Sequence, residues 1–411
     1  MINVENVIDR LRHVKPQTFI PEVVSIDKVT NPPLSEVDAA GLIEKYSIPS
    51  AELHRLGLFI FGIDVENRQI HGRQDGVIAG VDAFVSSDGG KVRAVERGEK
   101  NIDLDAGRLA AFISLPEDTP YTWKTDEILF HGKSTGLRIA EFPKDGLTGR
   151  FYLRTDRAGQ HSRLVINPRP ACESMCSWCA RAYPDRERIL GEKLEKKLQN
   201  PSELISDIES NPKIIAMGGF AAMTEINFIS GDFLPREIMT QQEYLIEFIN
   251  LARKKGFVGT YYYAGHQAFT QGGVKQIHSA LGPGRMCYTL EHISRRLELM
   301  PIKGRVAAEE VSRILTQTAK IMGPENTEYY LIAGIDTTEL VNAWINAHAG
   351  IAIPQVHVFT PYSPSHYNLI PGNRLQQLKN MLEVRGNILK NFGVGIPAGS
   401  NRSLFHLGGG V

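Results

Sequence analysis

Three of the four cysteines in this 411-residue chain lie within eight positions, at Cys172, Cys176 and Cys179. The C-x3-C-x2-C spacing allows a short loop to turn three thiolates toward one point, and thiolate is the ligand that iron–sulfur clusters use. A four-iron cluster held by three cysteines keeps one iron open for a further ligand. The spacing therefore predicts a 4Fe-4S cluster at this loop.

Other thiol chemistries fit the loop less well. A structural zinc site usually combines two ligand pairs, whereas this chain has no second pair and its next histidine along the sequence is His266. Disulfides are not expected among three crowded cysteines when the chain has only one other, Cys287. Zinc remains the alternative to iron and sulfur.

The composition indicates an ordinary globular protein. Lys+Arg and Asp+Glu both number 46, so the formal net charge is zero and gives no sign of a nucleic-acid partner. No apolar run approaches the ~20 residues that span a bilayer, which argues against a membrane partner. The first residues lack the basic and apolar regions of a signal peptide. We expect a cytoplasmic protein.

Residues 1–149 read as an α+β accessory domain that carries no chemical motif. A helix is expected around residues 38–46. Short apolar runs separated by turn signals favour a mostly antiparallel β or α+β region. These runs are residues 56–63, 77–85, 92–95, 109–113 and 128–131.

Residues 150–411 alternate strands with helices, which predicts a parallel sheet covered by helices and a TIM-type (β/α) barrel, full or partial. A capping box at Thr240 and Glu243 begins one of the helices. Other helices are expected at 307–322, around 340–348 and from 375 to a stop at Gly393. The expected strands are 151–154, 162–167, 225–230, 258–264, 286–291, 329–335, 354–360 and 393–398. Catalytic groups then belong at the C-terminal ends of the strands, where the cysteine loop lies.

The cysteine loop, with Trp178 directly before its last cysteine, resembles that of the radical S-adenosylmethionine (radical SAM) enzymes. The later strand ends are most similar to the biotin synthase-like branch, which includes methylornithine synthase and aromatic amino-acid lyases. The resemblance covers roughly residues 150–405. It implies an enzyme that cleaves SAM reductively at the 4Fe-4S cluster and uses the 5′-deoxyadenosyl radical to abstract a substrate hydrogen.

Ser230, Gly231 and Asp232 follow the second strand after residue 160 and resemble the family segment that holds the SAM amino group. A loop without a bulky side chain lets its carbonyl groups approach an ammonium, and Asp232 adds charge. Here serine and aspartate replace the family's first glycine and its glutamate. The glycine pair at 218–219 is a rival, but it precedes its strand.

Thr289 and Glu291 alternate onto one face of a strand, and the resemblance assigns them to the SAM ribose. Arg295 or Arg296 follows and is a candidate partner for the SAM carboxylate. The segment 301–304 also looks like the biotin synthase branch. Ile332, Gly334 and Ile335 resemble the strand that lies against adenine, although the first glycine of that pattern is absent.

The substrate is expected to be a polar small molecule, such as an amino acid or a sugar-like metabolite. Polar aromatic and imidazole side chains at strand ends could bind it: Tyr261, Tyr263, His266, His357, Tyr362 and His366. The fourth cysteine, Cys287, could return a hydrogen atom to a product radical if it points inward, although free cysteines are usually buried. We expect a rearrangement, a carbon–carbon cleavage or another redox-neutral outcome of the lyase or mutase type.

Two alternatives stay open: radical methyl or sulfur transfer, and a non-catalytic iron–sulfur electron carrier or scaffold. Too few cysteines exist for a second cluster, and no cobalamin motif is recognisable in the first 150 residues. The resemblance also implies a reduced flavodoxin or ferredoxin as electron donor. The sequence leaves the oligomeric state open.

Overall fold

A computed structural model describes residues 33–64, 73–74, 77–85, 107–114, 119–124, 127–141, 149–155, 162–177, 179, 194–270, 272–359, 369–370 and 372–392. Trp178 and the strands expected at 92–95 and 393–398 lie outside these residues. Two sheets organise the described part of the chain, one on each side of residue 150.

The larger sheet has seven strands in the order β13-β12-β11-β10-β9-β8-β7. β7 pairs antiparallel with β8, and every later neighbour pairs parallel. Each strand therefore lies beside the preceding strand of the chain, as the alternation of strands and helices predicts. The strands are β7 (Phe151–Thr155), β8 (Ser162–Ile166), β9 (Met223–Ile229), β10 (Thr260–Gly265), β11 (Arg285–Glu291), β12 (Thr327–Ala333) and β13 (Ile353–Val358).

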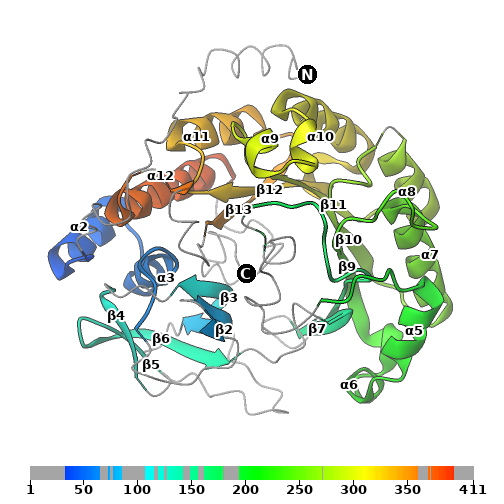
Figure 1. Cartoon of the computed structure of the whole chain (residues 1–411), viewed down its shortest axis with the longest axis horizontal. Helices are drawn as coiled ribbons and strands as arrows, with labels where there is room; N and C mark the ends of the chain where they lie inside the picture. The colour runs from blue at the N-terminus through cyan, green and yellow to red at the C-terminus, as the bar shows by residue number, and fades with distance from the viewer. Residues whose placement is uncertain are drawn as a thin grey trace.

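Helices cover the outer side of this sheet (Figure 1). The predicted capping box begins α7: Glu243 N–H donates to Thr240 Oγ1 at 3.3 Å, and Thr240 N–H donates to Glu243 Oε2 at 2.8 Å. The helices and short 3-10 turns are α5 (Pro201–Glu209), α6 (Pro212–Ala216), η2 (Gly219–Ala222), α7 (Gln241–Lys254), α8 (Gly273–Leu281), α9 (Arg296–Leu299), η3 (Lys303–Arg305), α10 (Ala308–Met322), η4 (Pro324–Asn326), α11 (Thr338–Ala347) and α12 (Arg374–Phe392).

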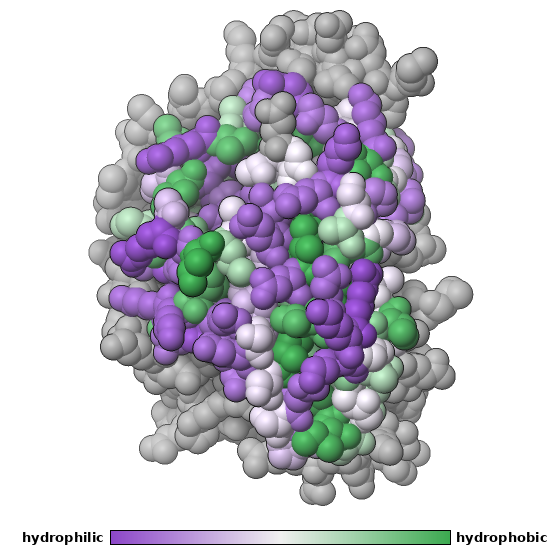
Figure 2. Space-filling view, turned by 90° about the vertical axis from the view of Figure 1, so that its right-hand side faces the viewer, coloured by the Kyte–Doolittle hydropathy of each residue, from purple (hydrophilic) through white to green (hydrophobic). Residues whose placement is uncertain are grey.

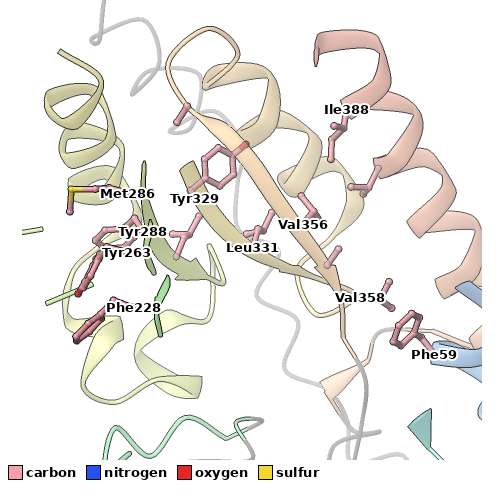
Figure 3. Packing of buried hydrophobic residues seen from close by; sticks show 14 of the residues in the cluster. Phe59, Phe228, Tyr263, Met286, Tyr288, Tyr329, Leu331, Val356, Val358 and Ile388 are labelled. Atoms are coloured by element: carbon pink, nitrogen blue, oxygen red, sulfur yellow. The ribbon is translucent and has the colours of Figure 1, made fainter. Parts of the chain in front are cut away.

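Side chains on β8–β13 alternate between two faces. The outer face joins the helices in one large hydrophobic cluster that includes Phe228, Tyr263, Tyr288, Tyr329 and Val356 (Figure 3). On the outside of the molecule, the face on the right of Figure 1 is largely hydrophilic with scattered hydrophobic residues (Figure 2). The opposite face of the sheet, here called the inner face, is rich in polar residues: Arg163, Glu225, Asn227, Tyr262, Arg285, Cys287, Thr289, Glu328, Tyr330, Gln355 and His357.

The smaller sheet lies in the N-terminal region, and all its pairings are antiparallel, as the turn-separated apolar runs predict. Its strands are β1 (Arg73–Gln74), β2 (Val77–Val85), β3 (Gly107–Ser114), β4 (Tyr121–Lys124), β5 (Glu127–Phe130) and β6 (Lys133–Glu141), preceded by α2 (Glu36–Tyr46) and α3 (Ser50–Phe61). One expectation is wrong: most of the apolar run at 56–63 belongs to helix α3. A short continuous apolar run does not distinguish a strand from a buried helix, because it has no period.

The described residues confirm a mixed α/β class with a mostly parallel sheet. β7 and β13 stand at the two ends of the strand order, so closure into a barrel is not shown. The division at residue 150 stays a prediction, because α2 and α3 contact α12 and one hydrophobic cluster includes residues from both regions. No helix in the described ranges is both long and apolar enough to span a bilayer.

Candidate functional site

The C-terminal ends of the parallel strands bring most of the predicted site residues to one edge of the sheet. The cysteine loop follows β8, Ser230–Asp232 follow β9, and His266 follows β10. Glu291 ends β11, and Gly334 follows β12. Polar side chains thus lie at the C-terminal ends of four consecutive strands, β8 to β11, where an α/β fold places its chemistry.

The cysteine side chains of the loop are largely buried, although Glu173 and Met175 between them are exposed. Cys172 and Cys176 are buried, Cys179 is half-buried, and all are free thiols. Cys179 N–H donates to the Cys176 carbonyl at 3.1 Å, and Ser177 N–H donates to the Leu299 carbonyl at 3.0 Å. Burial raises the pKa of the Cys176 thiol; the neighbouring Lys303 opposes this rise, while Cys172 and Cys179 add to it. Cys172 and Cys179 therefore both act on the thiol of Cys176.

The donors of this loop fit an iron–sulfur cluster chemically. Among the described residues, no three His, Cys, Asp or Glu side chains already form a site for a single metal ion. A single ion needs ligands that converge on one atom, whereas each thiolate of an iron–sulfur cluster binds its own iron. The three thiols of this loop, two of them buried, are soft donors that could each bind a separate iron.

The turn after β9 packs directly against the cysteine loop. Gly231 N–H donates to the Arg169 carbonyl at 2.9 Å, and Ser230 Oγ accepts from Arg169 N–H at 3.2 Å. A Cβ atom at position 231 would lie 2.3 Å from the Ala171 carbonyl oxygen, so a glycine is required there. Asp232 N–H then points to Cys172 Sγ, with a nitrogen–sulfur distance of 3.4 Å.

The Asp232 carboxylate lies among polar groups that come from other segments. Ser174 Oγ donates to its Oδ2 atom, and His266 Nδ1 lies 3.4 Å from Oδ1 without forming a hydrogen bond. Burial raises the pKa of Asp232 and lowers that of His266 to about 3, so the imidazole is neutral at physiological pH. This pair can exchange hydrogen bonds with a ligand.

The carbonyl groups predicted to receive an ammonium already accept bonds from the protein. Gln241 Nε2 donates to the Gly231 carbonyl at 3.1 Å, and Arg169 Nη1 donates to the Asp232 carbonyl at 2.6 Å. A carbonyl oxygen has two lone pairs, so each can accept a second donor. The rival glycine pair, Gly218 and Gly219, lies at the opposite end of β9, where η2 enters the strand.

Thr289 and Glu291 are separated by a bulge that the sequence did not reveal. The register with β12 shifts between them, and Glu291 has a φ of 64°. The regular alternation from which the shared face was predicted is therefore interrupted, because a bulge breaks the two-residue period. Nevertheless, Thr289 Oγ1 and Glu291 Oε2 are both buried atoms without a hydrogen-bond partner. Such atoms are uncommon in folded proteins and suit a bound ligand.

Lys303 is a site residue that sequence reasoning did not assign. Its Nζ atom lies 3.2 Å from Glu291 Oε1, and its side chain is 13% exposed. Burial acts to lower the pKa of Lys303, but Glu291, Cys176, Asp232 and Cys172 outweigh it and raise the pKa well above its ordinary value. The available signal was its place in the 301–304 segment that looks like the biotin synthase branch.

The two arginines proposed for the SAM carboxylate both have partners within the protein. Arg295 pairs with Glu298 on the next turn, which raises the pKa of Arg295. Arg296 is 3% exposed, and its guanidinium donates to four backbone carbonyl groups, those of Leu290, His292, Lys303 and Val306. The role of Arg295 stays a prediction; its pair with Glu298 uses the Nε and Nη2 atoms of the guanidinium.

The predicted adenine segment forms an apolar wall beside the cysteines. Ile332 and Ile335 belong to a small hydrophobic cluster with Cys176, Leu299, Met300 and Phe359, and Cys179 packs against this cluster. Gly334 has a φ of 115°, a conformation that other residues rarely adopt. The structure thus brings together the cysteine loop and the segment assigned to adenine, which lie more than 150 positions apart.

Cys287 lies on the inner face, below this edge. It is fully buried, in register with Glu328 on β12, and burial raises its pKa. Near it are three ion pairs, here called the basal ion pairs. Arg285 binds Glu225 at 2.5 Å and Glu328 at 3.0 Å, and Arg163 lies 3.5 Å from Glu225. Burial raises the pKa of Glu328 to about 7 despite the adjacent Arg285.

Comparison with known proteins identified no relative of this chain. No model of a protein family matches this chain, and neither does any curated protein sequence.

Proposed function

We propose that this protein is a radical SAM enzyme of the biotin synthase-like type, built on a full or partial (β/α) barrel. One observation supports this most strongly. The loop with three free thiols lies at the C-terminal edge of a parallel sheet, in contact with both Asp232 and the Ile332–Ile335 wall.

Cys172, Cys176 and Cys179 would hold the 4Fe-4S cluster. When bound, cluster and SAM together supply an electron and a 5′-deoxyadenosyl radical. The chain's own residues bind and orient: Asp232 offers a carboxylate to an ammonium, Glu291 and Thr289 offer oxygen atoms to hydroxyl groups, and the Ile332–Ile335 wall offers an apolar surface to a flat base. These groups match the chemical parts of SAM.

The same residues keep water from the reacting region. Cys176, Met300 and Ile332 are nearly inaccessible, and a radical is protected when competing hydrogen donors are excluded. Below them, the polar inner face can orient a polar small molecule through Thr289 and its neighbours on β12 and β13. A lyase or mutase reaction fits a site without a second group of cysteines. A reduced flavodoxin or ferredoxin would supply the electron.

The test is anaerobic reconstitution with iron and sulfide, followed by dithionite and SAM, with 5′-deoxyadenosine measured by mass spectrometry. We expect the wild-type protein to bind about four irons and to form 5′-deoxyadenosine. Cys176→Ala should lose both properties, whereas Cys287→Ala should keep its iron, since Cys287 lies outside the loop.

Other outcomes separate the alternatives. A cluster that forms but never cleaves SAM, even with a metabolite extract present, would favour an electron carrier or scaffold. Binding of a single zinc ion in place of iron and sulfide would reject the proposal at its first step.

A further inference from the structure

Contacts of the segment after α9 fix the position of one side chain, that of Lys303. The Arg296 guanidinium donates to the carbonyl group of Lys303 at 3.1 Å and to that of Val306 at 2.9 Å, at the two ends of η3. A Cβ atom at position 304 would lie 2.1 Å from the Arg296 carbonyl oxygen, so Gly304 allows the backbone to close onto α9. The backbone at Lys303 is therefore fixed from two directions.

The ammonium of Lys303 faces acids and thiols. Glu291 is its ion-pair partner at 3.2 Å, and the cysteine loop lies against the same segment, since Ser177 N–H donates to the Leu299 carbonyl at 3.0 Å. Cys172, Cys176 and Asp232 contribute to the raised pKa of Lys303. At 13% exposure, its charge is little screened by water.

The guanidinium groups nearby already bind other acids or carbonyl groups. Arg169 pairs with Glu173 and Glu237, and Arg295 with Glu298. Arg296 donates to backbone carbonyl groups. Lys303 has three donors and one ion-pair partner, so it retains capacity to interact with a further anionic group.

A bound cluster with three thiolates brings negative charge into a buried place, and reduction adds one more negative charge. Nearby charge, hydrogen bonds to the sulfurs and solvent exposure set the potential of such clusters. We propose that Lys303 is a positioning residue of the cysteine site, which compensates the negative charge of the bound cluster, raises its reduction potential and orients Glu291. This inference rests on the proposed function.

A purely structural role for Lys303 would give a different result. A lysine that only paired with Glu291 would affect stability when removed but would leave the cluster potential unchanged. The potential is therefore the readout that separates the two roles.

The experiment is a redox titration of the reconstituted protein, without SAM, followed by electron paramagnetic resonance. Lys303→Met should keep its iron but take up an electron at least tenfold less readily, a shift of about 59 mV to more negative potential. Lys303→Arg should stay closer to wild type. Lys320→Met, which removes an exposed lysine of α10, is the matched control and should not shift the potential.

Glu291→Gln keeps the test decisive if Lys303→Met fails to fold. It removes a negative charge from the same pair, so the potential should move in the opposite direction, to more positive values. A loaded wild-type protein whose potential responds to neither substitution overturns this inference and leaves the proposed function standing. A wild-type protein that loads no cluster overturns both.

Discussion

At the N-terminal ends of its parallel strands, the inner face carries charged side chains that form ion pairs with one another, although Glu225 Oε1 and Glu328 Oε2 make no hydrogen bond. At the C-terminal ends, a hydroxyl group, an imidazole nitrogen and one carboxylate oxygen have no hydrogen-bond partner. The basal ion pairs join Arg163, Glu225, Arg285 and Glu328 through contacts of 2.5 to 3.5 Å. Along the same strands, Thr289 Oγ1 and Glu291 Oε2 have no hydrogen bond, nor does His266 Nδ1 beyond the end of β10.

The difference distinguishes charged residues that link neighbouring strands from polar residues with atoms that a ligand could bind. A buried charge without a partner is strongly unfavourable, so the basal end depends on each of its members. A buried neutral group without a hydrogen-bond partner, or a carboxylate with only one oxygen paired, lowers the free energy of unfolding by less, about 1–3 kcal/mol, and a ligand can supply the missing partner. Substitutions at the two ends should therefore affect different properties.

Arg285→Met should have the largest effect on stability. It removes the common partner of Glu225 and Glu328 and leaves two buried carboxylates, so we expect a loss of about 3–5 kcal/mol in the free energy of unfolding. Urea denaturation measures this loss. The control is Arg313→Met, which breaks an exposed pair with Glu310 and should lose less than about 1 kcal/mol. Equal losses would contradict the importance assigned to the basal ion pairs.

Glu328→Gln should change how stability depends on pH. Burial raises the pKa of Glu328 from 4.5 to about 7, so the folded state holds a proton between these values that the unfolded state releases. Raising the pH through this window therefore destabilises the wild-type protein, by about 3 kcal/mol in total. The glutamine variant lacks this loss. In urea denaturation from pH 4.5 to 8, the free energy of unfolding of the variant should rise relative to that of the wild type. A difference that stays constant with pH would refute the raised pKa of Glu328.

Thr289→Val should have the smallest effect on stability and a visible effect on ligand binding. The hydroxyl has no partner in the protein, so its replacement by a methyl group should change the free energy of unfolding by less than about 0.5 kcal/mol. If SAM uses this hydroxyl, its affinity should fall about tenfold, the value of one hydrogen bond. Equilibrium dialysis with the reconstituted protein measures it. A large loss of stability with unchanged SAM affinity would place Thr289 with the basal residues.

Much of the sheet could be predicted from local pattern. Apolar strands separated by amphipathic helices have strong periods, and Thr240 with Glu243 marked the start of α7 correctly. The run at 56–63 failed because it has no period from which a helix could be recognised, and packing decided its conformation.

The site was harder to predict than the sheet. Thiol spacing and glycine-containing turns are local, and the structure places Gly231 and Ile332 beside the cysteine loop, as the resemblance implies. The bulge before Glu291 and the pairing of Arg295 with Glu298 depend on neighbouring strands and turns. Lys303 escaped assignment because its surroundings come from three separate segments, which no local pattern brings together.

The contact of Asp232 with Cys172 joins positions 60 residues apart, and the steric fit of Gly231 against Ala171 reinforces it. As the chain is synthesised, the cysteines emerge well before β9 does. Non-local pairings of this kind form slowly, because a long loop must close first. Until β8 and β9 meet, the three thiols are open to oxygen and to stray metal ions. Under the proposed function, loading of the cluster therefore has to follow sheet formation, and oxygen that reaches the thiols before that point would lower the yield of loaded protein.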